Sequence, residues 1–168
     1  MAVKQFEENS VRVSLREISR ENIKGILMLK VTPEQKKFYP RSNRYSIAEG
    51  HYPADDDPVW MRAIYADETP VGFLMTSEAP DKGMYFLWRL MIDAKHQGKG
   101  YGYRAVKLLI KRIEMSGNAK EIITSHLKHD GDAGSFYQKL GFNYTGELME
   151  GDEHVMKIVF ARYLGSFK

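Results

Sequence analysis

The stretch HQGKGYGYRA, residues 96–105, sets the interpretation of the whole chain. It places glycine at three alternate positions, Gly98, Gly100 and Gly102, between an apolar run and an amphipathic segment. Glycine costs conformational entropy when a chain folds, so the cluster indicates that the backbone itself is used here. A helix that starts in such a turn presents unpaired N–H groups, which can close on phosphate oxygens. The stretch therefore predicts a site for a phosphorylated cofactor.

Two common phosphate-binding motifs do not match this spacing. A dinucleotide fingerprint needs G-x-G-x-x-G early in the chain and an acidic residue about 20 residues later. A P-loop needs G-x-x-x-x-G-K-[ST], whereas this turn has G-x-G-x-G from Gly98 to Gly102. A glycine-rich turn without a ligand is the alternative, but the nearby Lys99 and Arg104 favour an anion.

The apolar residues around this turn predict the elements of one α/β domain. Alternating or continuous apolar residues predict strands at 11–17, 60–66, 71–77, 84–92, 121–127, 142–148 and 154–160. Helical spacing and capping residues predict helices after Ser19, from the capping box Thr32–Gln35, over 101–115 with a stop at Gly117, and over 133–140. Residues 41–58 are predicted to be less regular, with a helical turn at Ser46–Gly50. We expect a central mixed sheet, parallel only at the crossover helix.

Composition limits the class of protein. The 168 residues suffice for one domain with its own core, and no interval approaches the roughly 18 apolar residues of a membrane span. The N-terminal segment MAVKQFEENS lacks the apolar core of a signal peptide, so we expect a cytoplasmic protein. With 25 basic and 22 acidic residues, the charge balance does not indicate nucleic acid. The absence of cysteine excludes disulfides, thiolate metal sites and a cysteine acyl-enzyme.

Two motifs give the chain a family resemblance. Gln97, Gly100 and Gly102 match Q/R-x-x-G-x-G/A, and the stretch resembles the pyrophosphate-binding motif of the GNAT superfamily of acyl-CoA-dependent N-acetyltransferases. Downstream, DGDAGSFYQKLGF (130–142) is similar to the family segment N-x-x-A-x-x-[LF]-Y-x-x-x-G-F. The resemblance extends from about residue 60 to 160. It implies the GNAT fold, a mostly antiparallel twisted sheet of about six or seven strands flanked by helices, in a single acetyltransferase domain over 1–168.

The resemblance also implies acetyl-CoA as the cofactor and identifies residues that bind it. The strand end LMID (90–93) looks like the segment that pairs with the pantetheine arm in this family. Asp130 stands where the family often has asparagine, and an ionised aspartate cannot donate from its side chain, which leaves the usual contact there open. The expected cofactor-binding residues are Leu90, Met91, Ile92, Gln97, Gly98, Lys99, Gly100, Tyr101, Gly102, Tyr103, Asp130, Ser135 and Tyr137.

The same resemblance gives Tyr137 a catalytic role, because it matches the tyrosine that protonates the departing CoA thiolate in many members. A phenol suits this task, since the leaving sulfur gains negative charge as the amine attacks; a core aromatic is the alternative. The amine must be neutral to attack, so a base or a water relay is required. Many relatives place a glutamate near the position of Trp88, and here Glu147, His126 and an ordered water are the candidates. Main-chain N–H groups near Leu90 are expected to polarise the thioester carbonyl.

The acceptor is indicated by a looser resemblance. QKKFYPRSNRYSIAEGHY (35–52) and YFLWRLMID (85–93) look like bacterial spermidine/spermine N-acetyltransferases. Polyamines are flexible polycations, whose recognition needs carboxylates and aromatic faces. Asp55–Asp57 and Glu150 are further candidates for the carboxylates. Tyr45 and Tyr52 are further candidates for the aromatic faces. The expected substrate-binding residues are Glu49, Trp88, His126 and Glu147.

Several alternatives stay open at this point. One alternative is a different acceptor: an aminoglycoside or another drug, an amino acid or a protein N-terminus. The other is that the domain binds acyl-CoA without catalysing a reaction. His126, His129, Asp130 and Asp132 lack a recognised ligand spacing, so no metal is expected. The basic face of helix 101–115 is interpreted as solvated, with no nucleic-acid partner. Family members are often dimers, which leaves a homodimer as an open expectation.

Overall fold

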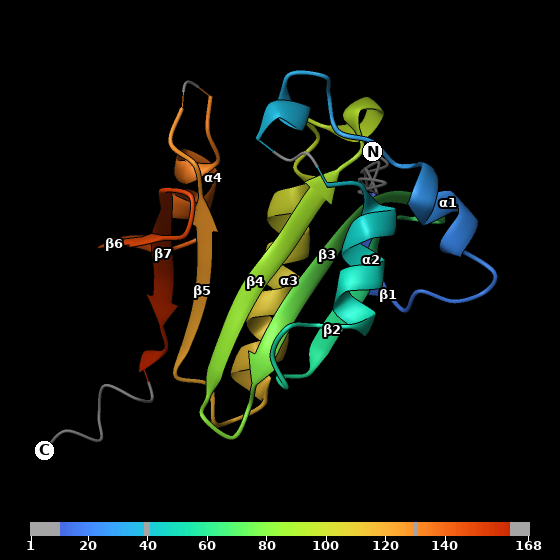
Figure 1. Cartoon of the computed structure of the whole chain (residues 1–168). Helices are drawn as coiled ribbons and strands as arrows, with labels where there is room; N and C mark the ends of the chain where they lie inside the picture. Colours follow the sequence, from blue (N-terminus) through green and yellow to red (C-terminus); the bar gives the residue numbers. More distant parts are fainter. Residues whose placement is uncertain (1–10, 39–40, 130, 162–168) are drawn as a thin grey trace, which may run out of the picture.

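The computed structural model describes residues 11–38, 41–129 and 131–161. It contains one seven-stranded sheet in the order β1-β2-β3-β4-β5-β7-β6, in which only β4 and β5 are parallel neighbours (Figure 1). This confirms the mixed, mostly antiparallel sheet with its single parallel crossover. The strands are β1 (Val13–Arg16), β2 (Val59–Ala66), β3 (Thr69–Ala79), β4 (Met84–Ile92), β5 (Glu121–His126), β6 (Asn143–Met149) and β7 (Glu153–Val159).

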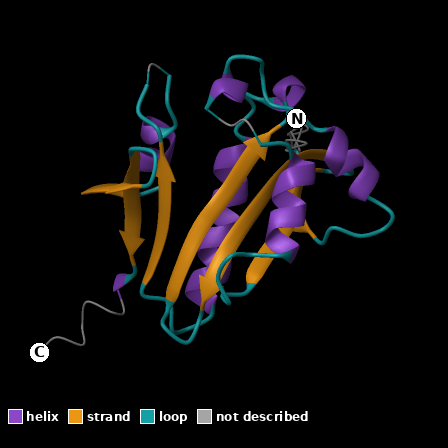
Figure 2. Cartoon of the chain, in the orientation of Figure 1, coloured by secondary structure: helices purple, strands orange, loops and turns teal. Residues whose placement is uncertain are grey.

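Helices cover both faces of the sheet, α1 and α2 in front and α3 behind in the view of Figure 2. Two hydrophobic clusters correspond to these faces. Ile26 of α1 packs with Phe73 and Met75 on one face, whereas Leu109 of α3 and Tyr137 of α4 belong to the cluster on the other. The helices are α1 (Ile23–Met28), α2 (Asn43–His51), α3 (Tyr101–Met115) and α4 (Gly134–Lys139), with 3-10 turns η1 (Gln35–Lys37) and η2 (Ala94–His96).

The segment before β2 is more regular than its sequence indicates. Residues 43–51 form a full helix, α2, where only a turn at 46–50 was predicted. Ser42 caps it by accepting a hydrogen bond from the Tyr45 N–H at 3.3 Å. The helix buries Asn43, Ser46 and Gly50. Small and polar residues on a buried face give no apolar periodicity, which explains why the pattern missed the helix.

The first helix also differs from the prediction at its start. It begins at Ile23, with Asn22 rather than Ser19 at the cap position, because Ser19 uses its hydroxyl in a tight turn with the Glu21 N–H. The capping box that follows is confirmed. Thr32 Oγ1 accepts from the Gln35 N–H and Gln35 Oε1 accepts from the Thr32 N–H, each at 3.3 Å.

The parallel pair β4 and β5 is joined at one end only. Its ladder runs from Met84 opposite Glu121 to Phe86 opposite Ile123 and then stops. Beyond that point the two strands diverge, as Figure 1 shows. The Leu87 carbonyl still accepts from the Thr124 hydroxyl of β5 at 3.2 Å, and beyond it the β5-facing edge of residues 88–92 lacks a neighbouring strand within the described part of the chain.

A β-bulge in β4 changes which face its side chains occupy. Met75 of β3 lies opposite Arg89, and Thr76 lies opposite Leu87, so Trp88 is an extra residue without a partner. Trp88 packs against the cluster on the α1/α2 face, and Arg89 reaches α2 on that same face. Leu87 belongs to the cluster on the α3 face. The bulge thus presents two consecutive side chains to α2.

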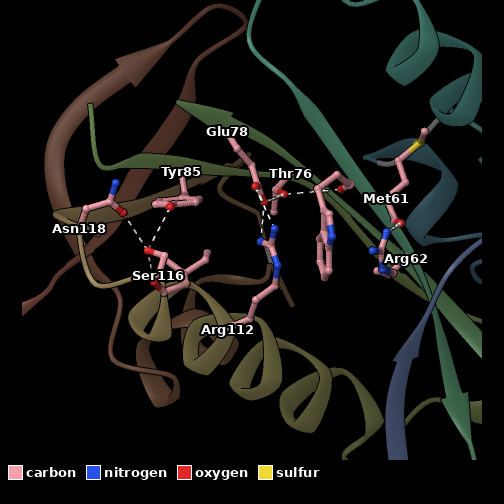
Figure 3. A network of polar contacts seen from close by, with 10 residues as sticks. Met61, Arg62, Thr76, Glu78, Tyr85, Arg112, Ser116 and Asn118 are labelled. Atoms are coloured by element: carbon pink, nitrogen blue, oxygen red, sulfur yellow. Dashed lines mark hydrogen bonds and ion pairs between the residues drawn. The ribbon is translucent and has the colours of Figure 1, made fainter. Parts of the chain in front are cut away.

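At the joined end of the sheet, α3 is fastened to β3 by a partly buried ion pair (Figure 3). The Arg112 guanidinium donates to both carboxylate oxygens of Glu78, at 2.7 and 3.1 Å, and the Thr76 hydroxyl donates to the same carboxylate at 2.7 Å. Tyr85 adds a hydrogen bond to Ser116 just after α3. These contacts fix the axis of α3, and therefore the place where its N-terminus meets the sheet.

Among the described residues, none of the helices has both the length and the apolar composition that a membrane span requires.

Candidate active site

The glycine-rich turn uses its glycines for two different reasons. Gly98 and Gly100 have φ of +75° and +74°, and a Cβ at either position would meet no atom within 4 Å. The left-handed backbone, rather than lack of space, requires glycine there. Gly102 has no such φ, but its Cβ would lie 3.3 Å from Ile92 at the end of β4. The turn is therefore left-handed at its first two glycines and close-packed at the third.

The start of α3 offers backbone donors to a ligand. Gly100 is its N-cap, and the Arg104 N–H is the first to bond back, to the Gly100 carbonyl at 3.1 Å. Within the described chain, the N–H groups of Tyr101, Gly102 and Tyr103 have no protein acceptor. These donors coincide with the positive end of a 15-residue helix, and the exposed Lys99 adds positive charge. An anion fits this position.

The turn is held against the end of β4 by two side chains. Gln97 Nε2 donates to the Ile92 carbonyl at 2.9 Å and to Gln35 Oε1 at 2.7 Å. The buried Asp93 carboxylate accepts from the Lys95 N–H and from the Lys30 N–H, at 3.2 and 2.9 Å. Gln97, expected to bind cofactor, here positions the turn; its contact with a cofactor stays a prediction.

Residues 30–38, which we call the bridge segment, contact both sides of the region where β4 and β5 separate. Phe38 stacks on His129 in the loop after β5, with ring centroids 3.4 Å apart and planes 11° apart. The bridge segment thus links the end of β4 to the loop that follows β5. Sequence analysis did not identify these contacts, because they join residues distant in the chain.

Tyr137 lies on α4, and its side chain is buried. Its ring packs edge-to-face on Phe136 and Phe142, with centroids 5.2 and 5.5 Å away. Asp132 fixes the start of α4 by accepting from the Gly134 N–H at 2.7 Å. Burial acts to raise the pKa of Asp132, but hydrogen bonds from Gly134 and His129 hold it below its usual value.

Two other predicted cofactor residues lie near α4. Ser135 is exposed at the second position of the helix. Asp130 lies outside the described residues. Leu90, Met91 and Ile92 occupy the open stretch of β4, with side chains packed into the two clusters and the strand edge turned toward the gap. Their placement is compatible with main-chain pairing to a ligand arm.

His126, a candidate for the base, has both ring nitrogens engaged. Nδ1 lies 3.0 Å from the Leu127 carbonyl, so it carries the proton, and Nε2 lies 3.0 Å from the Tyr144 hydroxyl, which donates to it. Burial, and then the charge of Asp132, raises the pKa of Tyr144. This network leaves neither His126 nitrogen an open position for a substrate proton.

The remaining substrate candidates fall on two separate parts of the sheet. Glu49 of α2 and Trp88 of β4 are on the same face, and Glu49 is paired with Arg89 at 3.0 Å and with Arg41 at 2.8 Å. Glu147 is exposed on β6, the edge strand, and is separated from β4 by two strands. Sequence analysis gave no role to Arg89, the single charge in the apolar run 84–92, and the structure shows that it anchors Glu49 to β4.

Solved N-acetyltransferases have this fold. The spermidine N-acetyltransferase of Vibrio cholerae, crystallised with CoA and spermine, has a TM-score of 0.70 at 17% identity, covering 90% of this chain and 98% of its own. An aminoglycoside acetyltransferase in complex with coenzyme A has a TM-score of 0.71 at 16% identity, covering 94% of this chain and 100% of its own. The fold class is therefore that of the N-acetyltransferases.

Sequence comparison identifies the family. The model of the Acetyltransferase (GNAT) family matches residues 24–142, and the chain belongs to this family. A curated relative, the spermine/spermidine N(1)-acetyltransferase of Bacillus subtilis (strain 168), is 29% identical over 150 residues, which are 86% of this chain and 96% of the relative. The protein is a GNAT-type N-acetyltransferase, as its two motifs indicate.

Proposed function

We propose that the protein transfers the acetyl group of acetyl-CoA to a primary amine of a polyamine such as spermidine or spermine. The observation that carries the proposal is the glycine-opened start of α3, with unpartnered N–H groups, beside the open edge of β4. Coenzyme A bound to solved proteins of this fold supports the donor. The polyamine activity of the Bacillus subtilis relative supports the acceptor.

The chemistry of the described residues suits this donor. The N–H groups of Tyr101, Gly102 and Tyr103 bind its pyrophosphate, and Lys99 adds charge. The edge of residues 90–92 pairs with the amides of the pantetheine arm. When bound, acetyl-CoA would supply an activated acyl thioester, and the N–H near Leu90 would donate a hydrogen bond to its carbonyl oxygen.

Transfer proceeds by direct attack in a ternary complex. The amine nitrogen forms a bond to the acyl carbon, the carbon–sulfur bond breaks, and the Tyr137 hydroxyl gives its proton to the departing thiolate. Because both His126 nitrogens are engaged, a water carries away the proton of the amine. No cysteine is present to form an acyl-enzyme. Location in the cytoplasm and assembly into a homodimer stay predictions.

An amine panel tests this proposal. CoA release is measured with spermidine, spermine, an aminoglycoside, amino acids and peptides, and the product mass identifies the acetylated amine. We expect turnover with the polyamines and initial-rate lines that intersect, as a ternary complex requires. Release of CoA with none of the amines would overturn the enzymatic proposal, and release only with another class would overturn the polyamine acceptor.

A further inference from the structure

On α2, an aromatic ring and a carboxylate form a cradle for a cation. Tyr45 and Glu49 are four residues apart on the helix, so their side chains are neighbours on one face. The guanidinium of Arg41 already lies in this cradle. It is 2.8 Å from Glu49 Oε1, and its central carbon lies 4.8 Å from the centre of the Tyr45 ring. A carboxylate beside an aromatic face is the chemistry that recognises an ammonium group.

The two arginines that contact Glu49 are held very differently. Arg89 is on a buried strand, its side chain is 15% exposed, and it also donates to the Trp88 carbonyl at 2.9 Å. The Arg41 side chain is 47% exposed and lies just before the cap of α2. Ion pairs as exposed as the one between Arg41 and Glu49 contribute little to stability. Arg89 therefore fixes one oxygen of Glu49, and Arg41 can leave the other.

We propose that Arg41 is an internal substitute for the substrate, occupying in the free enzyme the subsite that takes a distal ammonium of the polyamine. This inference rests on the proposed function. When the substrate enters, its ammonium replaces the guanidinium on Glu49 Oε1 and Tyr45, so the carboxylate still faces two cations. Arg89 directly precedes Leu90 in β4, so its ion pair ties the cradle to the residue next to the one whose N–H the proposed function assigns to the thioester. Arg41 thus competes with every substrate that carries a second charge.

The test compares a polyamine with a monoamine. In Arg41→Gln we expect the KM for spermidine to fall about threefold to fivefold, the range that loss of an exposed ion pair allows. The ratio of this KM to the KM for n-butylamine falls by the same factor, because a monoamine has no second charge to place. The matched control is Arg44→Gln, which removes an exposed arginine from α2, the helix that carries Tyr45 and Glu49. It leaves the ratio of the two KM values unchanged.

A double-mutant cycle separates competition from a structural role. Glu49→Gln raises the spermidine KM and cancels the gain from Arg41→Gln, since the two side chains act through one contact. Thermal unfolding of each variant shows whether the fold is retained. A wild-type enzyme that acetylates spermidine, with an unchanged or higher spermidine KM in Arg41→Gln, overturns this inference and leaves the proposed function standing. A wild-type enzyme that acetylates no polyamine overturns both.

Discussion

The two ends of the β4–β5 pair differ in what holds them together. At one end a short parallel ladder joins β4 to β5, and the Glu78–Arg112 ion pair joins β3 to α3. At the other end the strands separate, and the N–H groups at the start of α3 have no acceptor among the residues that the structure describes. Under the proposed function, the two ends of the same elements therefore serve stability and ligand binding separately. Substitutions at the two ends should therefore have separable effects.

The largest expected effect is at the open end. Tyr137→Phe removes the hydroxyl that the proposed mechanism uses as the proton donor, while keeping the ring that packs on Phe136 and Phe142. We expect kcat to fall about 100-fold or more, with CoA affinity and thermal stability nearly unchanged. Steady-state rates, CoA titration and thermal unfolding measure the three quantities. Unchanged turnover would remove Tyr137 as the acid and leave it a core aromatic.

At the joined end the expected effect is on stability alone. Glu78→Gln removes the charge that faces Arg112, and partial exposure of Arg112 moderates the cost to about 1–3 kcal/mol of unfolding free energy. Urea denaturation measures it, with Glu114→Gln on the exposed side of α3 as control. The KM values should not change. A large change in the KM for acetyl-CoA would show that the two ends are coupled.

A matched pair of glycines sharpens the comparison. Gly100→Ala and Gly117→Ala both place a Cβ at positive φ in open space, one before α3 and one after it. Each substitution should cost about 1–2 kcal/mol of strain. We expect only Gly100→Ala to weaken CoA binding, by about tenfold, as measured by calorimetric titration. Equal losses of affinity would place the phosphate site elsewhere.

The smallest expected effect concerns Asp132. Its pKa is lowered in the folded state, so its contribution to stability is present above the unfolded value of 3.8 and is lost as pH falls through the folded value. An asparagine oxygen can accept from the Gly134 N–H as the carboxylate does, so Asp132→Asn should lose less than about 1 kcal/mol at pH 6. The difference from wild type should shrink below pH 3.8. Denaturation at several pH values tests this, and a difference that grows on acidification contradicts it.

Local features were predictable from the sequence, and tertiary ones were not. The glycines at 98, 100 and 102 impose their conformation within a few residues, so the turn and the helix after it were recognised. The helix α2 was missed because its buried side is Asn43, Ser46 and Gly50. The pairing of Glu49 with Arg89 depends on a bulge that no alternation of apolar residues reveals.

Trp88 has a consequence for how this enzyme can diversify. Side chains along a strand normally alternate between the two faces of the sheet. The extra residue interrupts this alternation, so odd-numbered and even-numbered residues exchange faces after it. Side chains 88 and 89 both lie on the α1/α2 face, while Leu90 packs into the cluster on the α3 face. Under the proposed function, two adjacent positions that face α2 can therefore vary to suit the amine while the side chains that pack beneath α3 stay unchanged. One extra residue lets a single strand meet two requirements that strict alternation would tie together.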